Sequence, residues 1–276
     1  NPSFMKCYGI TRNNDGKYMI ILKYAEAGSL RSNIDLVSKL KWKDKLNLLQ
    51  SIAYDLKIIH SSNIIHRDLH SGNILQDNLH SAYISDLGLS IQYFNENDNE
   101  VYGILPYVAP EILNKKPYTT SSDIYSFGMI MWEVLYGQCI TNYYKLNDAS
   151  EIMQETMQIF EGKTPPINKE APQFYVNLMK RCWSKVSENR PSACELCEMF
   201  ERWQDDEQII TELNKFDPLK LLQYYIDMIK LFFNEDLQIF SELDPKLLSK
   251  KNFNSKKISN LQSQQPNLSI SSSDFK

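Results

Sequence analysis

The sequence has little net charge, few cysteines and no long apolar run that is free of charges. Its 276 residues carry 30 Lys and Arg against 34 Asp and Glu, a formal net charge of −4, so no basic surplus favours nucleic acid as a partner. The apolar stretch at 219–240 contains Lys220, Asp227, Lys230 and Glu235, which argues against a membrane span. The five cysteines are an odd number at irregular spacings, typical of reduced thiols, and we expect a cytoplasmic location.

Two apolar stretches near the start predict an antiparallel hairpin. They lie at 4–10 and 18–24, and the turn between them contains Asp15-Gly16, a strong hairpin signal. Gly28 then interrupts the extended pattern, and Ser29 is a residue type that caps helices. The sequence therefore predicts strand, turn, strand and helix in this order.

Helical spacing of apolar residues dominates the chain up to residue 205. It predicts helices at 42–61, 119–135, 151–161, 173–183 and 193–203. Residues 87–111 form a long polar stretch without regular pattern, and loops of this length are usually functional or mobile. We expect three parts, with bounds at 1–205 for a domain, 206–248 for a helical extension and 249–276 for a disordered basic tail with five Lys against one Asp.

Two short polar stretches carry the candidate chemistry. His66-Arg67-Asp68-Leu69-His70-Ser71-Gly72-Asn73 follows one apolar run, and Ser85-Asp86-Leu87-Gly88 follows another. Taken singly, Asp68, Asn73 and Asp86 would each be interpreted as ordinary turn residues. Together they supply two oxygen ligands that suit Mg²⁺ and a further carboxylate that can orient a hydroxyl. That combination is what phosphoryl transfer needs.

These two stretches resemble the catalytic loop and the metal-binding loop of protein kinases, with Leu87 where Phe is usual. The resemblance covers about residues 1–205 and implies an α+β, protein-kinase-like fold, with a mainly helical C-lobe and a truncated β N-lobe. It implies that Asp68 orients the substrate hydroxyl and accepts its proton, while Asn73 and Asp86 bind Mg²⁺. ATP would be the phosphate donor.

The resemblance also assigns structural supports. Glu111, in Ala-Pro-Glu, and Arg190, in Asn-Arg-Pro, match a buried ion pair of the kinase C-lobe. Asp123 would hold the backbone of the catalytic loop, although alone it would be interpreted as a first-turn helix acid. A packed column that links the active geometry to the large helix would contain His66, Leu87 and Cys7.

The same likeness places the nucleotide beside the second predicted strand. Leu22 falls at the gatekeeper position, and the backbone of Lys23, Tyr24 and Ala25 would hydrogen-bond the adenine. Leu75, just after the catalytic loop, is also assigned to the nucleotide site. No side-chain recognition is needed there, because backbone groups at the strand edge recognise the base.

Arg67 has two interpretations. In kinases this arginine commonly pairs with a phosphate on the activation loop, but it could simply hydrogen-bond carbonyls nearby. The loop here has no Thr, so its candidate phosphorylation sites are Ser90, Tyr93 and Tyr102. A further hypothesis is that an acid stands in for the phosphate, and a solvated loop is the simpler alternative. The candidate acids are Glu96, Asp98 and Glu100.

Residues around the loop point to the tyrosine-kinase-like group with Ser/Thr specificity. Tyr107 favours Ser/Thr, because tyrosine kinases usually have Trp there, whereas Met131-Trp132-Glu133 is typical of tyrosine kinases and their relatives. Ile104 departs from the Thr that is common in Ser/Thr kinases. His70, where Ser/Thr kinases usually have Lys, could contact the transferred phosphate or have no direct role.

Three other kinase elements are missing from this sequence: a Gly-rich loop, a strand lysine and a helix glutamate that pairs with it. The chain opens with Asn1 where the fourth strand is expected, so we expect a fragment of a longer protein. Three functions stay open. The first is a kinase that phosphorylates Ser/Thr, with Tyr as the alternative, on protein substrates in intracellular signalling. The others are a pseudokinase-like interaction module and a binding role in which 206–248 engages a regulatory partner. The intact set Asp68, Asn73 and Asp86 favours the first.

Overall fold

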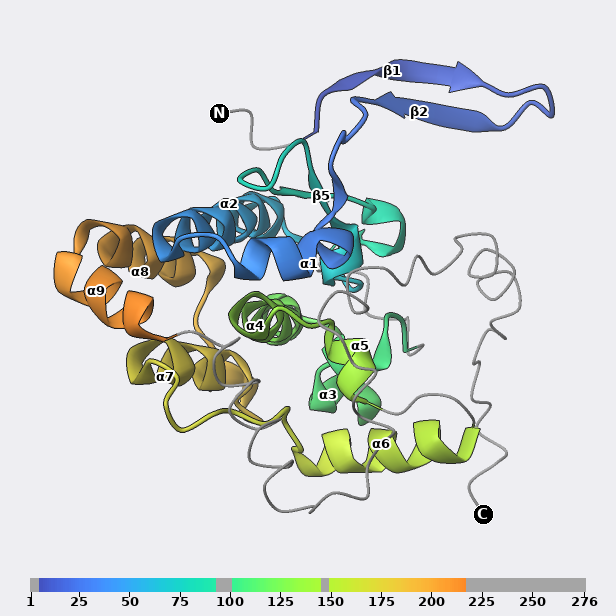
Figure 1. Cartoon of the computed structure of the whole chain (residues 1–276). Coiled ribbons are helices and arrows are strands. Elements are labelled where there is room, and N and C mark those ends of the chain that lie inside the picture. The colour runs from blue at the N-terminus through green and yellow to red at the C-terminus, as the bar shows by residue number, and fades with distance from the viewer. Residues whose placement is uncertain (1–4, 93–100, 145–148, 217–276) are drawn as a thin grey trace, which may run out of the picture. The chain divides into compact units, whose positions relative to one another are not determined.

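The computed structural model describes residues 5–92, 101–144 and 149–216, which belong to one compact unit that runs to Pro218 (Figure 1). Most of the extension, the basic tail, Tyr93 and the three acids at 96, 98 and 100 lie outside the described residues. Among the helices that are described, none is long and apolar enough to cross a membrane. All five cysteines are free thiols.

The predicted hairpin is present and projects from the helices (Figure 1). Strand β1 (Cys7–Arg12) pairs antiparallel with β2 (Tyr18–Leu22). Asn13 closes the turn, because its Oδ1 accepts the backbone N–H of Asp15 and of Lys17. Every residue of β2 is exposed, so both faces of this strand are open to solvent in the described part of the chain. The strand ends two residues before the predicted bound.

A small sheet connects the segment after the hairpin to the catalytic loop. Its order is β3 (Gly28–Ser29), β5 (Ile74–Gln76) and β6 (Tyr83–Ile84), and both pairs are antiparallel. The central strand β5 follows the catalytic loop directly. A second pair joins β4 (Ile64–Ile65), just before that loop, to β7 (Ile91–Gln92). Short strands therefore fix both ends of the catalytic loop.

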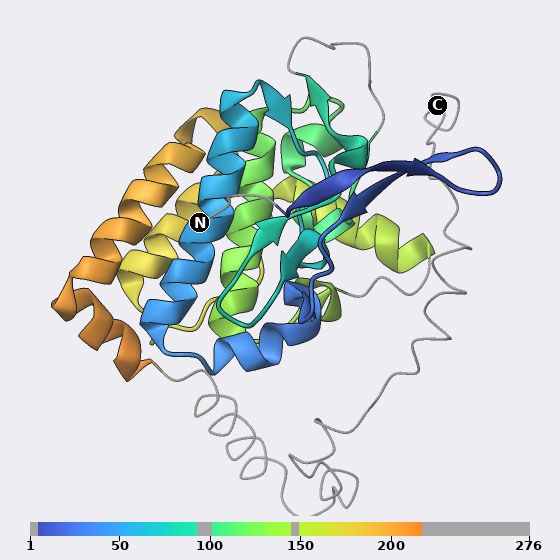
Figure 2. The ribbon, with the colours of Figure 1, turned by 90° about the horizontal axis from the view of Figure 1, so that it is seen from above.

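Helix α1 (Leu30–Ser38) begins at the predicted cap. The Ser29 hydroxyl accepts the N–H of Ser32, and the Ser32 hydroxyl in turn accepts the N–H of Ser29. Helix α2 (Trp42–Ser61) has the predicted bounds and packs along α8 (Ala193–Asp205), as Figure 2 shows. Its apolar face is fully buried at Leu46, Leu49, Ile52, Ala53 and Leu56.

Helix α4 (Thr120–Tyr136) is the central helix of the unit. All residues from 122 to 135 are buried, because α1, α2 and α7 (Gln173–Cys182) pack around it. Gly128 permits the closest contact: a Cβ there would lie 2.6 Å from the Trp183 indole. Gly137 ends the helix in a left-handed conformation (φ 69°), which glycine adopts without steric cost.

One expectation needs correction. The described parts of the stretch 87–111 are more regular than their composition indicates, since they contain β7, 3₁₀ turns at Leu87–Leu89 and Leu105–Tyr107, and the start of α3 (Pro110–Leu113). Helix α9 (Glu207–Lys215) lies in the predicted helical extension and packs on α8 and α2, burying Leu213 and placing Phe216 against Tyr136, while the domain bound at 205 stays a prediction. The remaining helices are α3 (Pro110–Leu113), α5 (Ile140–Tyr143), α6 (Ala149–Glu161), α7 (Gln173–Cys182) and α9 (Glu207–Lys215).

Candidate active site

The backbone of the catalytic loop is held by a buried carboxylate from α4. Asp123 Oδ2 accepts the N–H of His66 at 2.9 Å, and Oδ1 accepts the N–H of Arg67 at 3.0 Å. Arg67 adopts a left-handed conformation (φ 73°), which is uncommon for a residue with a side chain. His60, in the last turn of α2, also contacts Asp123, with Nε2 2.9 Å from Oδ2. The contact predicted between Asp123 and the loop backbone is therefore present.

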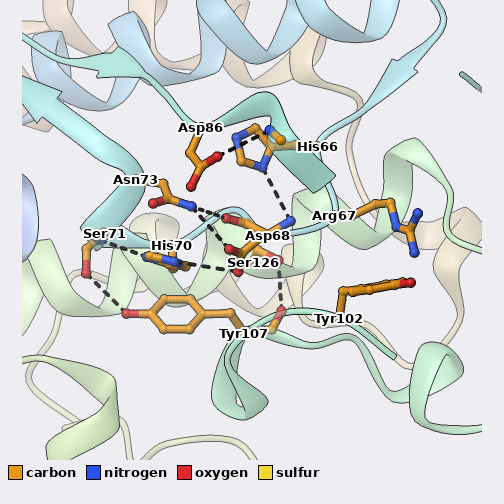
Figure 3. Close-up of polar contacts among 12 residues, drawn as sticks. His66, Arg67, Asp68, His70, Ser71, Asn73, Asp86, Tyr102, Tyr107 and Ser126 are labelled. Carbon is orange, nitrogen blue, oxygen red and sulfur yellow. Dashed lines mark hydrogen bonds and ion pairs between the residues drawn. The ribbon is translucent and has the colours of Figure 1, made fainter. Parts of the chain in front are cut away.

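Asp68 and Asn73 face each other across the loop (Figure 3). Asn73 Nδ2 donates to the Asp68 carbonyl at 2.9 Å and to Asp68 Oδ2 at 3.3 Å. This orients the amide so that its nitrogen faces Asp68 and its oxygen faces away. The Asp68 side chain keeps 18% of its surface exposed, which leaves it accessible to a substrate hydroxyl. A carboxylate fixed in this way can accept a proton from that hydroxyl.

Asp86 is brought to Asn73 by the strands that follow the loop. Strand β6 pairs with β5, and the next residue, Ser85, donates from both its N–H (2.9 Å) and its hydroxyl (2.8 Å) to the Asn73 carbonyl. Asp86 is left-handed (φ 60°, ψ 68°), and its Oδ1 accepts the Gly88 N–H at 3.2 Å. Figure 3 shows the side chains of Asp86, Asn73 and Asp68 gathered together.

The donor set fits a magnesium ion. Asn73 and Asp86 offer oxygen atoms, which a hard cation prefers, and Mg²⁺ usually keeps waters and phosphate oxygens in its other positions. Within the described ranges, no group of three or more His, Cys, Asp and Glu side chains forms a denser metal site. A two-residue site of this kind would rely on the phosphates of a bound nucleotide.

His66 is fully buried beneath the loop. Its Nδ1 accepts the N–H of Asp68 at 3.3 Å, so the proton is on Nε2, which donates to the Ser85 carbonyl at 3.0 Å. The expected packed column is otherwise wrong for this structure. Leu87 is 46% exposed and Cys7 is exposed, because no described element packs over the hairpin or over the turn that follows Asp86.

A buried polar network lies on the other side of the loop. The Tyr107 hydroxyl donates to Glu133 Oε1 at 2.6 Å and lies 3.2 Å from the Ser71 hydroxyl. The His70 ring packs against Tyr107, and its Nε2 is 3.6 Å from Asp68 Oδ1 (Figure 3). Burial raises the pKa of Glu133, although the hydrogen bond from Tyr107 opposes this. Tyr107 and His70 thereby connect Asp68 to α4.

Arg67 stacks between two tyrosine rings. Its guanidinium carbon lies 4.2 Å from the ring centre of Tyr102 and 4.7 Å from that of Tyr118, a cation–π geometry. Tyr118 holds Tyr102 in place, because its hydroxyl accepts the Tyr102 N–H and donates to the Tyr102 carbonyl. Next in the chain, Gly103 approaches Asp68: a Cβ there would lie 3.4 Å from Asp68 Oδ1.

The candidate phosphorylation sites differ in how much the structure says of them. Ser90 is partly buried, and the Tyr102 ring stacks on Arg67 while Tyr118 holds its backbone, so its side chain is not freely presented. Tyr93 lies outside the described residues, as do the acids that could replace a phosphate. Phosphorylation, and its replacement by an acid, stay predictions.

The predicted ion pair is present. Arg190 Nη1 and Nη2 donate to Glu111 Oε1 and Oε2 at 2.6 and 2.7 Å. The guanidinium also donates to the carbonyls of Ser184 and Ser121, both at 2.9 Å. The Arg190 side chain is completely buried. This pair connects α3 to the residues just before α8.

The segment assigned to the adenine is only partly enclosed. Leu22 is 46% and Tyr24 82% exposed, whereas Ala25 is buried. The Lys23 N–H donates to the Lys6 carbonyl at 2.8 Å, so an adenine contact would fall to other backbone groups of 23–25. The Lys23 ammonium lies 2.5 Å from Asp77, which holds this segment to the turn after β5. Leu75 pairs with Ser29 and Tyr83 in the small sheet.

Sequence reasoning missed four residues that shape the site. Glu133 is a buried and His60 a half-buried polar side chain on a helix, and a polar residue within an apolar helical face was the available signal. Ser85 precedes Asp86 and could have been noticed as a hydroxyl at the loop junction. Gly103 (φ 103°) ends a polar stretch, where a glycine often marks a close backbone approach.

Comparison with known proteins identifies the family. The family model for protein tyrosine and serine/threonine kinases matches residues 1–200. A protein of Acanthamoeba polyphaga mimivirus named as a serine/threonine-protein kinase/receptor is 34% identical over 63% of this chain and 10% of its own length. A LIM domain-containing serine/threonine-protein kinase of Dictyostelium discoideum is 28% identical over 73% of this chain and 30% of its own. A serine/threonine/tyrosine-protein kinase of Arabidopsis thaliana is 28% identical over 68% of this chain and 48% of its own.

This chain thus spans less than half of the length of each of these relatives. The family match nevertheless covers both of the loops that converge at Asp68, Asn73 and Asp86. The chain belongs to the protein tyrosine and serine/threonine kinase family.

Proposed function

We propose that this chain is the catalytic part of a protein kinase that transfers the γ-phosphoryl group of ATP to Ser and Thr hydroxyls of protein substrates. The observation that carries the proposal is the convergence of Asp68, Asn73 and Asp86 on one accessible point. Members of this family use ATP and Mg²⁺. The names of the relatives support Ser and Thr as acceptors, and one of them includes Tyr.

Each residue has a separate task in this reaction. Asp68 orients the acceptor hydroxyl and takes its proton as the new bond to phosphorus forms. The oxygens of Asn73 and Asp86 would hold Mg²⁺, which supplies charge neutralisation on the phosphates. Asp123 and His66 fix the loop backbone so that the Asp68 carboxylate does not need to be ordered during the reaction.

The test uses the protein at its full natural length. Thermal melting with Mg-ATP measures nucleotide binding, and Asp86→Asn should remove most of the magnesium-dependent shift because it replaces a charged ligand. Phosphorylation of a generic protein substrate, followed by phosphoamino-acid analysis, should give phosphoserine and phosphothreonine. Phosphotyrosine alone would contradict the specificity. Absence of any melting shift at millimolar nucleotide would contradict the enzyme and support a pseudokinase-like module.

A further inference from the structure

A cavity of about 480 Å³ lies where the last turns of α2 meet the starts of α4 and α8. Its volume is within the range of small-molecule sites in proteins, roughly 300–1,000 Å³. Ligands can enter it from solvent, because Ser61 and Ser192 among its lining residues are exposed. Lys57 and His60 also line it, and His60 contacts Asp123. The cavity is therefore one side chain away from the carboxylate that holds the catalytic loop, but outside the candidate active site.

Lys57 carries a charge that is not balanced within the cavity. Among the described residues, no carboxylate lies at ion-pair distance from its ammonium group. A hydrogen bond with the Cys194 thiol raises the pKa of Lys57, so the group is charged at neutral pH. The acid that lines the cavity, Glu195, is already engaged, since it accepts the Ser192 N–H at 2.7 Å and lies 3.7 Å from Arg181 Nη2.

Two helix starts add hydrogen-bond donors to the same cavity. The first two residues of α4 and of α8 all line it: Thr120, Ser121, Ala193 and Cys194. The first N–H groups of a helix have no intrahelical acceptor, and they carry partial positive charge. The capping boxes use the third N–H of each helix, at Ser122 and Glu195, so they leave the first two for a ligand.

Arg190 supplies a buried donor to the cavity. Its side chain is completely buried and is part of the lining. Four of its five N–H groups have acceptors, two on Glu111 and one each on the carbonyls of Ser184 and Ser121. The fifth, on Nη2, has no acceptor among the described residues. A buried N–H normally has an acceptor, which a ligand oxygen would supply here.

We propose that this cavity binds a phosphate monoester. Such a group has three terminal oxygens and about two negative charges, which suit a lysine and the N–H groups of two helix starts better than the two oxygens of a carboxylate do. Ile124, Pro191 and Ala193 in the lining would contact the organic part of the ligand. The phosphate could belong to a small metabolite or to a phosphorylated serine of a protein, and the test distinguishes these sources. The site is independent of the proposed function, because neither Asp68 nor Asn73 lines it.

The test uses a cysteine of the cavity as the reporter. Cys194 lines the cavity, whereas Cys7 is exposed on the hairpin and serves as the internal control. The full-length protein, without nucleotide or Mg²⁺, is alkylated with iodoacetamide, and mass spectrometry gives the rate at each cysteine. Glycerol phosphate and a phosphoserine peptide are compared with glycerol and with the corresponding Ser and Glu peptides.

We expect at least one phosphate ligand to slow alkylation of Cys194 in a saturable manner and to leave Cys7 unchanged. Protection by glycerol phosphate alone would assign the site to small metabolites, and protection by the phosphopeptide alone would assign it to a phosphorylated protein segment. No protection at millimolar concentration would overturn the proposal. So would equal protection by the ligands that lack phosphate. None of these readouts needs catalysis, so they hold whether or not the chain transfers phosphate.

A lysine pair on α2 tests the assigned cation. Lys57→Gln should raise the Kd of the phosphate ligand, taken from the concentration dependence of protection, by about tenfold or more, the effect of one charge-assisted hydrogen bond. Lys43→Gln, at an exposed position of the same helix, is the control and should keep the wild-type Kd. An unchanged Kd in Lys57→Gln would contradict the site. The wild-type protection experiment decides the question even where a variant does not fold.

Discussion

The carboxylate of Asp123 accepts the backbone N–H of His66 at 2.9 Å, across 57 residues of sequence. A second oxygen of the same group accepts the next N–H, so one buried side chain of α4 fixes two successive peptide units of the catalytic loop. The loop is thus positioned by the most enclosed helix of the unit. Its geometry depends on the packing of α4 as much as on its own residues.

Replacing Asp123 by Asn should weaken both stability and turnover. One of the two N–H groups would face an NH₂ group instead of an oxygen, and a buried unsatisfied donor costs about 1–3 kcal/mol. We expect a matching loss in the free energy of unfolding and at least a roughly tenfold loss in kcat. Urea unfolding and a phosphorylation assay measure the two. Asp35→Asn, an exposed acid on α1, is the control. Equal losses of stability and kcat in the two variants would contradict the role of Asp123 in holding the loop backbone.

Removing Arg190 should destabilise the whole unit. Its side chain is completely buried and makes two hydrogen bonds with Glu111, so Arg190→Ala leaves an uncompensated buried carboxylate. Such a loss typically costs about 3–5 kcal/mol. The melting temperature of Arg190→Ala should fall sharply, whereas that of Arg202→Ala, on the surface of α8, should hardly change. An unchanged melting curve for Arg190→Ala would show that the pair is dispensable.

Asp55 should make stability fall as pH rises. Burial raises the pKa of this α2 carboxyl from 3.8 to about 7, and the hydrogen bond from the Ile84 N–H opposes the shift only in part. Between about pH 4 and 7 the folded protein holds a proton that the unfolded chain has lost. The free energy of unfolding therefore decreases through this window, by up to about 1.4 kcal/mol per pH unit from this group alone.

Asp55→Asn should remove that contribution, since Asn has no charged form and its oxygen can still accept from Ile84. Urea unfolding at pH 5 and pH 8 measures the change for each protein. We expect the wild type to lose about 2–4 kcal/mol more than the variant between these pH values. The exposed Asp35→Asn should follow the wild type. The same pH dependence in Asp55→Asn and wild type is the result that would exclude this role.

Gly103 and Gly16 both have a positive φ, but only Gly103 lies close to Asp68, so Gly16 serves as the control. Gly103 (φ 103°) would place a Cβ 3.3 Å from the Arg67 carbonyl, whereas Gly16 (φ 78°) in the hairpin turn has nothing within 4 Å. Alanine at either position should cost about 1–2 kcal/mol from its backbone conformation. Only Gly103→Ala should also lower kcat, because the new Cβ would push the backbone around Gly103 away from the catalytic loop. Equal kcat values in the two variants would contradict that coupling.

Much of the site could be predicted from local sequence, for physical reasons. The bounds of α2 follow from regular apolar spacing, and the Ser29 cap follows from its hydroxyl and its position before an apolar run. The contact between Glu111 and Arg190 could be predicted only through the family likeness, because 79 residues separate them. Spacing alone contains no information on which distant charges meet.

The predicted packed column was wrong because the burial of a side chain depends on which other elements cover it, and the local sequence does not show this. Leu87 and Cys7 are apolar enough for a packed column, yet the described chain places no layer over them. Helix α9 lies in the predicted extension, but its packing through Leu213 and Phe216 could not be read from the composition of 206–248.

The most direct test of the central claim is phosphate transfer by the wild-type protein at full natural length and by Asp68→Asn. The amide can still accept a hydrogen bond but cannot take up the proton, so we predict a kcat lower by about 10²–10⁴-fold, with the Mg-ATP melting shift retained. Asp44→Asn, a half-exposed acid on α2, should transfer phosphate like the wild type. Wild-type turnover in Asp68→Asn, or no transfer by the wild type, would contradict the account.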